Sequence, residues 1–259
     1  MIELTDTVRL EKEGGVALVV VDSPPVNALS WHVRQGLFDG VNRAVEEGAS
    51  AIVILCEGRT FIAGADISEF GGGAPEAAGL HEVQAAMEDA PVPVVAAIHG
   101  TALGGGLEVA LCAHYRVALS SAKFGLPEVN LGLLPGAGGT QRLPRLTGVT
   151  TALEMVTSGR HIGSDEASEC GLVDQVVDGD HDALRAAAVA FARRAVAESL
   201  PLAKVRDRAD KVAEVKDHPE IFSDFRAEIA RRTRGFLAPE YNIRCIEAAV
   251  ELPFEEGLD

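Results

Sequence analysis

Two glutamates in the sequence stand where a carboxylate is costly. Glu108 stands two residues after the glycine triplet 104–106, at the start of an apolar helical stretch, and Glu128 follows Pro127 in a nearly uncharged segment. An ionised carboxyl group in apolar surroundings has to be paired, protonated or used for chemistry. Taken singly, each glutamate fits a capping or salt-bridge residue equally well. Together, beside glycine-rich segments, they indicate two carboxylates that act on one substrate.

Backbone amides in the glycine-rich turns could supply the other half of such a site. A glycine-rich turn that enters a helix presents free N–H groups and the positive end of the helix dipole, and Gly105 lies in such a turn. A second donor could come from the loop 63–66. Two donors would form an oxyanion hole, in which loss of one donor typically costs ~10²–10³ in rate. The pattern favours enolate chemistry on a carbonyl compound, although glycine clusters equally serve turns and close packing.

The motifs of other common chemistries fail. The dinucleotide fingerprint GxGxxG breaks at Gln141, and no GxxxxGK phosphate loop occurs. The zinc motif HExxH begins at His81 but has Ala85 in place of the second histidine, and the SxxK spelling at Ser120 lacks its partner motifs. The cysteines are far apart in apolar segments, which predicts reduced core residues: Cys56, Cys112, Cys170 and Cys245. We therefore expect neither a metal nor a bound cofactor.

Alternating strand and helix patterns must position these residues. Apolar, β-branched runs predict strands at 16–21, 51–56, 92–98, 115–119 and 172–177, and periodic stretches predict helices at 31–47, after Ser30 as N-cap, and at 107–113. This order predicts an α/β fold with mostly parallel strand pairing. The glycine-rich stretch 71–75 is typical of a mobile surface loop.

The composition changes near Asp180, where the strand patterns end. Four helices are predicted beyond it, at 181–198, 201–216, 219–234 and 239–252, with prolines near their starts. We therefore expect a core domain over residues 1–195 and a helical C-terminal region over residues 196–259. That region could cover the core, mediate oligomerisation or lead into another module.

Charge and hydrophobicity exclude several classes of partner. The 259 residues include 23 Lys and Arg against 39 Asp and Glu, a formal net charge of −16, so nucleic acid is not expected as a partner. No apolar run approaches the ~18–20 residues that span a bilayer, and the N-terminus lacks a basic region followed by an apolar stretch. The sequence therefore predicts a cytoplasmic protein without a membrane partner.

Four ordered motifs carry a resemblance to a known family. They are FIAGADI at 61–67, GTALGGGLE at 100–108, FGLPE at 124–128 and LPGAGGTQRL at 134–143. From about Val8 to Arg194 the chain resembles the enoyl-CoA hydratase/isomerase (crotonase) family. The resemblance implies a crotonase-like fold of repeated ββα units in two stacked sheets, with a helical C-terminal region. It also implies a substrate presented as a coenzyme A thioester, with no separate cofactor.

The resemblance assigns roles to the glutamates and the loops. Ala65 and Gly105 match the positions whose backbone N–H groups bind the thioester oxygen, and Glu108 and Glu128 match the two catalytic glutamates of hydratases. Because both acids are present, the resemblance favours a hydratase of 2-trans-enoyl-CoA in fatty-acid β-oxidation. Glu108 would activate water, and Glu128 would deliver a proton to C2. The motifs imply further substrate contacts at Ala63, Gly64, Asp66, Ile67, Gly104, Pro127 and Gly136.

One departure from the family concerns the phosphates of coenzyme A. Several relatives carry a lysine directly after the GADI motif, where Ser68 stands here. Arg59, near the same loop, is a candidate phosphate contact and equally fits a solvated surface charge.

A finer resemblance links the chain to larger enzymes. The segments 114–118, 132–136 and 247–257 look like the N-terminal hydratase half of multifunctional β-oxidation enzymes, whose other half is a 3-hydroxyacyl-CoA dehydrogenase. The chain would then be a stand-alone hydratase or a part of such an enzyme, with a dehydrogenase as a possible partner. A 3,2-enoyl-CoA isomerase and a non-catalytic acyl-CoA-binding protein are the alternatives. The family implies a homo-oligomer, a trimer or a hexamer, unless the tail folds back over its own domain.

Overall fold

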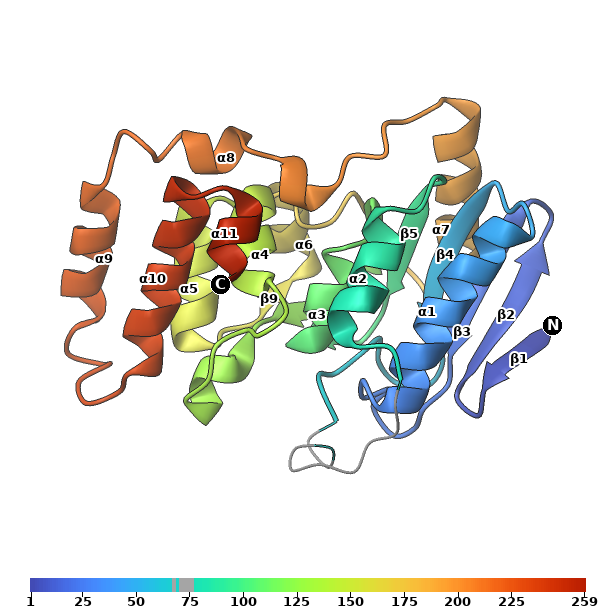
Figure 1. The fold of residues 1–259 in the computed structure, drawn as a ribbon, viewed down its shortest axis with the longest axis horizontal. Helices are drawn as coiled ribbons and strands as arrows, with labels where there is room; N and C mark the ends of the chain where they lie inside the picture. The colour runs from blue at the N-terminus through green and yellow to red at the C-terminus, as the bar shows by residue number, and fades with distance from the viewer. Residues whose placement is uncertain (67–68, 70–76) are drawn as a thin grey trace.

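The main sheet forms the centre of the first two thirds of the chain. The computed structural model describes residues 1–66, 69 and 77–259 (Figure 1). Seven strands lie in the order β1-β2-β3-β4-β5-β7-β10. Their bounds are Ile2–Thr5, Val8–Glu13, Val16–Val21, Ala51–Cys56, Val94–Ile98, Tyr115–Leu119 and Gln175–Val177. The first three strands pair antiparallel, and every pairing from β3 to β10 is parallel, which confirms the prediction of mostly parallel pairing.

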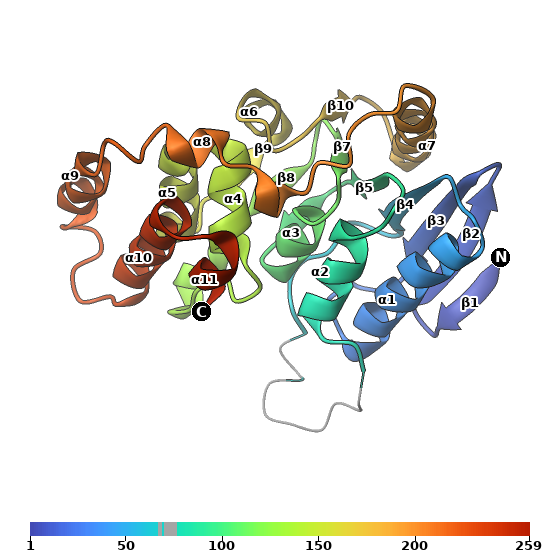
Figure 2. The ribbon, with the colours of Figure 1, turned by 45° about the horizontal axis from the view of Figure 1, so that its top comes forward.

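Both faces of this sheet are covered. All residues of β3 and β4 are buried, because helices pack on either side, and this explains their continuous apolar runs. Alternate residues of β3 belong to two separate core clusters: Val19 faces the helices α1 (Trp31–Glu46) and α2 (Leu80–Glu88), whereas Leu18 faces α7 (His181–Ala197). Figure 2 shows α7 on the opposite side of the sheet from α1 and α2. The helix α1 begins after the predicted N-cap Ser30, whose side chain accepts a hydrogen bond from the backbone N–H of Val33.

A second, smaller sheet carries the loops that hold the glutamates. It contains β6 (Thr101–Leu103), β8 (Lys123–Gly125) and β9 (Ile162–Gly163) in the order β6-β8-β9. The helix α3 (Gly105–Ala110) follows β6, and the 3₁₀ helix η2 (Pro127–Leu131) follows β8. Because β6 and β8 are parallel neighbours, their carboxyl ends lie side by side. The mixed α/β architecture with two sheets agrees with the fold that the motifs imply.

The remaining helices gather at the end of the molecule away from β1 (Figures 1 and 2). They are α4 (Gly139–Thr147), α5 (Val149–Ser158), α6 (Ser164–Glu169), η3 (Val205–Asp207), α8 (Asp210–Ala213), α9 (Glu220–Ile229), α10 (Ala238–Glu251) and α11 (Phe254–Leu258). The helix α10 packs against α4 and α5, so the C-terminal helices share one core cluster with the first part of the chain.

Two features of the C-terminal part differ from the prediction. The single helix predicted at 201–216 is wrong: the backbone is extended at Lys204 and Arg208, and only the short η3 and α8 form. Tertiary contacts hold this segment, because the hydroxyl of Tyr115 donates to the carbonyl of Pro201 at 2.6 Å and Lys204 pairs with Asp89. The helix α11 was not predicted.

The other differences are smaller. All four cysteines are free; Cys56 and Cys112 are buried as predicted, whereas Cys170 and Cys245 are only half-buried, with Cys170 packed against the core. The predicted loop at 71–75 lies outside the described residues. Over the part of the chain that is described, no helix is long and apolar enough to cross a membrane.

Candidate active site

A cavity of about 390 Å³ is lined by most of the site residues that were predicted from the motifs. Every site residue expected from the sequence lines it except Asp66 and Ile67; Ile67 lies outside the described residues. The expected residues that line the cavity are Ala63, Gly64, Ala65, Gly104, Gly105, Glu108, Pro127, Glu128 and Gly136. Much of the remaining wall is leucine: Leu80, Leu103, Leu131, Leu133 and Leu134. The cavity is therefore an apolar space that contains two carboxyl groups.

Glu108 is held in place by the backbone of a neighbouring loop. It lies in the first turn of α3 and is only 3% exposed. Its Oε1 accepts hydrogen bonds from the backbone N–H groups of Ala137 and Gly139, both at 2.8 Å. Gly139 has to be glycine here, because a Cβ atom would lie 2.9 Å from that oxygen. The carboxylate is thus fixed by two amides and has no ion pair among the described residues.

Glu128 approaches the same cavity from η2. Its Oε1 lies 3.1 Å from the position that a Cβ on Gly104 would occupy, so the two loops are in close contact. Gly104 adopts φ +52°, ψ −129°, a conformation that other residues rarely adopt, and this turn leads directly into α3. The Oε2 atom of Glu128 is buried and has no hydrogen-bond partner among the described residues. A ligand group that donates a hydrogen bond at this position would satisfy this oxygen.

The two carboxyl groups influence one another. Burial raises the pKa of Glu108, and the amides of Gly139 and Ala137 act in the opposite direction. Burial, together with the charge of Glu108, raises the pKa of Glu128 to about 7. Such neighbouring groups titrate as a coupled pair. The backbone amides favour the ionised form of Glu108, whereas burial and the charge of Glu108 favour the protonated form of Glu128.

Two free amides complete the site. Gly105 begins α3, and its ideal Cβ position lies 3.8 Å from the backbone nitrogen of Ala65, so the two residues are neighbours. The loop of Ala65 is fixed to the start of α1, because the N–H of Leu29 donates to the carbonyl of Gly64 at 2.9 Å. Neither the N–H of Ala65 nor that of Gly105 has a partner in the described part of the chain. The pair can bind the oxygen of a carbonyl group.

Seven residues that line the cavity were not predicted as site residues. Four of them are leucines that lie in β6 or η2 or follow η2: Leu103, Leu131, Leu133 and Leu134. Leu80 and His81 belong to α2, a helix that was not predicted because the apolar periodicity of its sequence is weak. Ala137 belongs to the LPGAGGTQRL motif, but no role was assigned to it. The candidate phosphate contact Arg59 is exposed and does not line the cavity. No group of three or more His, Cys, Asp and Glu side chains within residues 1–66, 69 and 77–259 could hold a metal ion.

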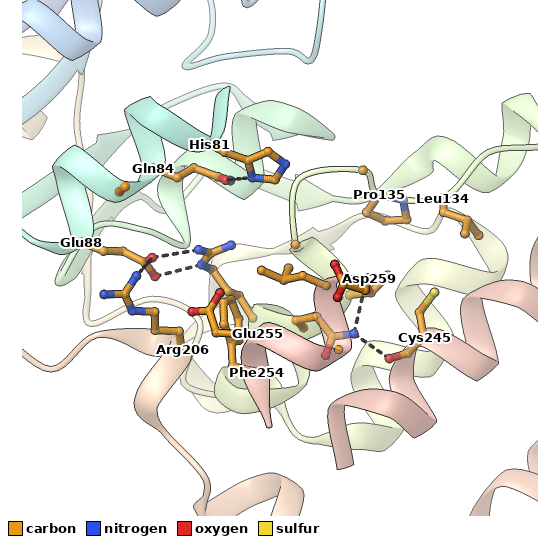
Figure 3. Close-up of a pocket in the computed structure, with 18 residues that line it drawn as sticks. His81, Gln84, Glu88, Leu134, Pro135, Arg206, Cys245, Phe254, Glu255 and Asp259 are labelled. Carbon is orange, nitrogen blue, oxygen red and sulfur yellow. Dashed lines mark hydrogen bonds and ion pairs between the residues drawn. The ribbon is translucent and has the colours of Figure 1, made fainter. Parts of the chain in front are cut away.

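A second cavity, of about 590 Å³, adjoins the first and shares His81, Leu134 and Gly136 with it (Figure 3). It lies between α2, α4 and α11. At its wall Arg142 donates to both carboxylate oxygens of Glu88, at 2.9 and 2.8 Å, and Arg206 lies 3.6 Å from Glu88. The loop 134–138 therefore separates an apolar cavity with carboxyl groups from a polar cavity with a complete ion pair.

Comparisons with known proteins place this geometry in a family. The family model of enoyl-CoA hydratase/isomerase matches residues 11–227. The human peroxisomal bifunctional enzyme is 43% identical over 250 residues, which cover 94% of this chain and 33% of that enzyme. A probable enoyl-CoA hydratase of Bacillus subtilis (strain 168) is 43% identical over 175 residues, 65% of this chain and 68% of the relative. This chain thus spans about a third of the length of the bifunctional relatives.

The solved structures agree with the family assignment. An enoyl-CoA hydratase subunit I from Geobacillus kaustophilus HTA426 superimposes with a TM-score of 0.68 at 33% identity, covering 89% of this chain and 90% of that chain. The family model covers most of this chain. The Bacillus subtilis relative, of which this chain covers 68%, is 43% identical to it. The chain belongs to the enoyl-CoA hydratase/isomerase family.

Proposed function

We propose that this chain is an enoyl-CoA hydratase of fatty-acid β-oxidation, which adds water across the 2,3 double bond of a 2-trans-enoyl-CoA and forms a 3-hydroxyacyl-CoA. One observation carries the proposal: Glu108 and Glu128 line the same cavity as the free amides of Ala65 and Gly105. Many relatives of this fold with other chemistries keep the oxyanion hole but lack one or both of these carboxyl groups, so the presence of both supports a hydratase. An acyl-CoA substrate fits the family to which the chain belongs.

In the proposed reaction the thioester oxygen accepts hydrogen bonds from Ala65 and Gly105. These amides stabilise the enolate charge that develops on that oxygen when water attacks. The ionised Glu108 orients one water molecule, whose oxygen adds to C3, and Glu128 gives its proton to C2. One proton of the water stays on the new hydroxyl group at C3. The other passes to Glu108, so the glutamate pair again holds one proton.

The test is the loss of the conjugated-enoyl absorbance when the protein meets crotonyl-CoA and longer 2-trans-enoyl-CoAs. We expect turnover by the wild-type protein and its loss in Glu108→Gln and Glu128→Gln. Hydration that continues unimpaired in Glu128→Gln would contradict the assigned roles. Tight acyl-CoA binding without turnover would favour the non-catalytic binding protein instead.

Isomerisation of 3-enoyl-CoA is the second candidate activity. It needs the oxyanion hole and one proton carrier, and the buried Oε2 of Glu128, without a described partner, supplies such a carrier. No water is activated in this reaction. We therefore expect Glu108→Gln to retain more of an isomerase activity than of the hydratase activity, which can be measured with 3-enoyl-CoA.

Partners and location extend the proposal. The resemblance to the hydratase half of multifunctional β-oxidation enzymes suggests a dehydrogenase as partner, and the family suggests a homotrimer or hexamer; the human relative is named a bifunctional enzyme. We propose no cofactor besides the coenzyme A of the substrate and no nucleic-acid or membrane partner; Arg59, exposed outside the cavity, fits a solvated surface charge as well as a phosphate contact. A cytoplasmic location is also proposed, although the human relative is named as peroxisomal.

A further inference from the structure

Gln84 is a buried polar residue for which the proposed reaction has no role. It lies on α2 and is 1% exposed. Its Nε2 donates to the carbonyl of Ala137 at 2.8 Å and lies 3.4 Å from the carbonyl of Glu108. A buried carboxamide is costly unless its hydrogen bonds are made. The position of Gln84 therefore connects α2 with the backbone that carries Glu108 and with the loop beside it.

Ala137 links Gln84 to the carboxylate of Glu108. Its carbonyl accepts from Gln84, while its N–H donates to Oε1 of Glu108 at 2.8 Å. The second donor to Oε1 is the N–H of Gly139, two residues further along the same loop. The backbone of Gly139 lies close to the Glu108 carboxylate, since a Cβ on Gly139 would be 2.9 Å from Oε1 of Glu108. A shift of the Ala137 carbonyl would therefore move both amides.

Two neighbours hold the Gln84 carboxamide and its acceptor in place. The Nδ1 atom of His81 lies 3.2 Å from Oε1 of Gln84, which directs the NH₂ group toward Ala137 (Figure 3). Arg142 donates to the same Ala137 carbonyl at 3.2 Å, and Glu88 fixes Arg142 through two hydrogen bonds. His81, Gln84 and Glu88 occur at positions i, i+3 and i+7, so they share one face of α2.

We propose that Gln84 is a positioning residue for Glu108: its carboxamide holds the Ala137–Gly139 backbone so that both amide hydrogens remain on the carboxylate. This inference rests on the proposed function. The charged and titratable groups that interact with Glu108 are Glu128 from η2, His81 from α2, Arg142 from α4 and Cys112, which follows α3. Glu88 from α2 is paired with Arg142. Because the two amides lower the pKa of Glu108 against the effect of burial, a loosened loop would raise it.

The test replaces Gln84 by a side chain of similar shape without a donor. In Gln84→Met we expect kcat for crotonyl-CoA to fall about 10-fold or more, because a small displacement of a catalytic group is costly. KM should change much less, and the acid limb of the kcat profile should move to higher pH. Gln84→Asn keeps the amide one methylene shorter and should lie between Gln84→Met and the wild-type protein.

Gln141→Met is the matched control. Gln141 is also 1% exposed, but its Nε2 donates to the carbonyl of Cys245 on α10, at 2.8 Å, and lies 3.4 Å from the hydroxyl oxygen of Thr140; neither bond is to Ala137 or Glu108. The two variants lose the same buried amide, so a merely structural role predicts the same changes in both. We expect Gln141→Met to keep the wild-type acid limb. A Gln84→Met variant with wild-type kcat and pH profile, or a Gln141→Met variant with the same shift, would overturn the inference.

A second readout separates this inference from the proposed function. The titration of the Glu108 carboxyl, followed by ¹³C NMR in the free protein, requires no turnover. We expect its midpoint to rise in Gln84→Met and to stay in place in Gln141→Met. An unmoved midpoint in Gln84→Met overturns the positioning role whether or not the chain is a hydratase, whereas an inactive wild-type protein overturns only the proposed function.

Discussion

Glu88 and Glu108 are buried glutamates, 1% and 3% exposed, in two adjoining cavities. Arg142 donates to both oxygens of Glu88, so this carboxylate is neutralised by a cation. Glu108 receives two backbone amides instead, burial raises its pKa, and its charge in turn raises the pKa of a second carboxyl group, Glu128. The comparison shows that burial alone does not distinguish the carboxylate proposed to be catalytic from one held in an ion pair. What distinguishes Glu108 is burial without an ion pair among the described residues, since Arg142 lies near it but is paired with Glu88.

The difference has a physical consequence for each residue. A buried pair such as Glu88–Arg142 depends on both partners, because removal of one leaves an uncompensated charge in a poorly solvated place. A buried carboxyl without an ion pair is already destabilised in its ionised form, which makes it reactive toward a proton. We therefore expect opposite balances of stability and activity in the two cavities.

The largest expected effect is on the activity of Glu108→Gln. The amide keeps an oxygen that can accept from Ala137 and Gly139 but cannot serve as a base. We expect kcat for crotonyl-CoA to fall on the order of 10²–10⁴-fold. The free energy of unfolding, measured in urea, should stay the same or rise, because a buried charge has been removed. A marked loss of stability would show that Glu108 is a structural residue like Glu88.

Glu88→Gln should show the reverse balance. The substitution leaves Arg142 buried without its carboxylate, which costs about 3–5 kcal/mol in such pairs. We expect that loss in the unfolding free energy, with kcat reduced far less than in Glu108→Gln. If Glu88→Gln unfolds at the same urea concentration as the wild-type protein, the ion pair contributes nothing and the comparison fails.

The pH dependence of stability should reveal Glu128. Its pKa is raised to about 7 in the folded protein, above the ordinary value of 4.5, so the folded state holds this proton more tightly than the unfolded state. The stability that the proton provides is fully present below about pH 4.5 and is lost as pH rises through about 7. Glu128→Gln should therefore gain in melting temperature, relative to wild type, between pH 4.5 and pH 8. An equal difference at both pH values would contradict the raised pKa.

The smallest effect concerns the outer wall of the second cavity. The ring of Phe254 lies 4.9 Å from the guanidinium carbon of Arg142 and 5.2 Å from that of Arg145. Phe254→Ala should cost about 1–2 kcal/mol of unfolding free energy without a change in kcat. Phe236→Ala, at a ring that is 70% exposed, is the control and should stay within about 0.5 kcal/mol of wild type. Equal losses in the two variants would show that the cation–π contacts add nothing.

The sequence predicts the elements whose pattern is local. The strands β3 and β4 are buried on both faces, so their residues form short, continuous apolar runs, and this pattern is typical of a buried strand. Glu108, Glu128, Ala65 and Gly105 were predicted because carboxylates beside glycine-rich turns are unusual in themselves, and the motifs assign their roles. The structure brings these four residues to one cavity.

Tertiary contacts decide what the sequence could not predict. Residues 201–216 have helical composition, but Tyr115 and Asp89 hold the segment extended against the core. The link from Gln84 through Ala137 to Glu108 joins residues 24 to 53 positions apart, and no local pattern predicts such a contact. The ion pair of Glu88 with Arg142 spans 54 positions for the same reason.

The central claim is that Glu108 and Glu128 act as one unit on one water molecule. The most direct measurement compares crotonyl-CoA hydration by wild type, Glu108→Gln, Glu128→Gln and the double variant. Groups that act as a unit are strongly non-additive, so we predict that the double variant is no slower than the slower single variant. If the losses multiply in the double variant, or if either single variant hydrates at the wild-type rate, the shared role of the two glutamates is contradicted.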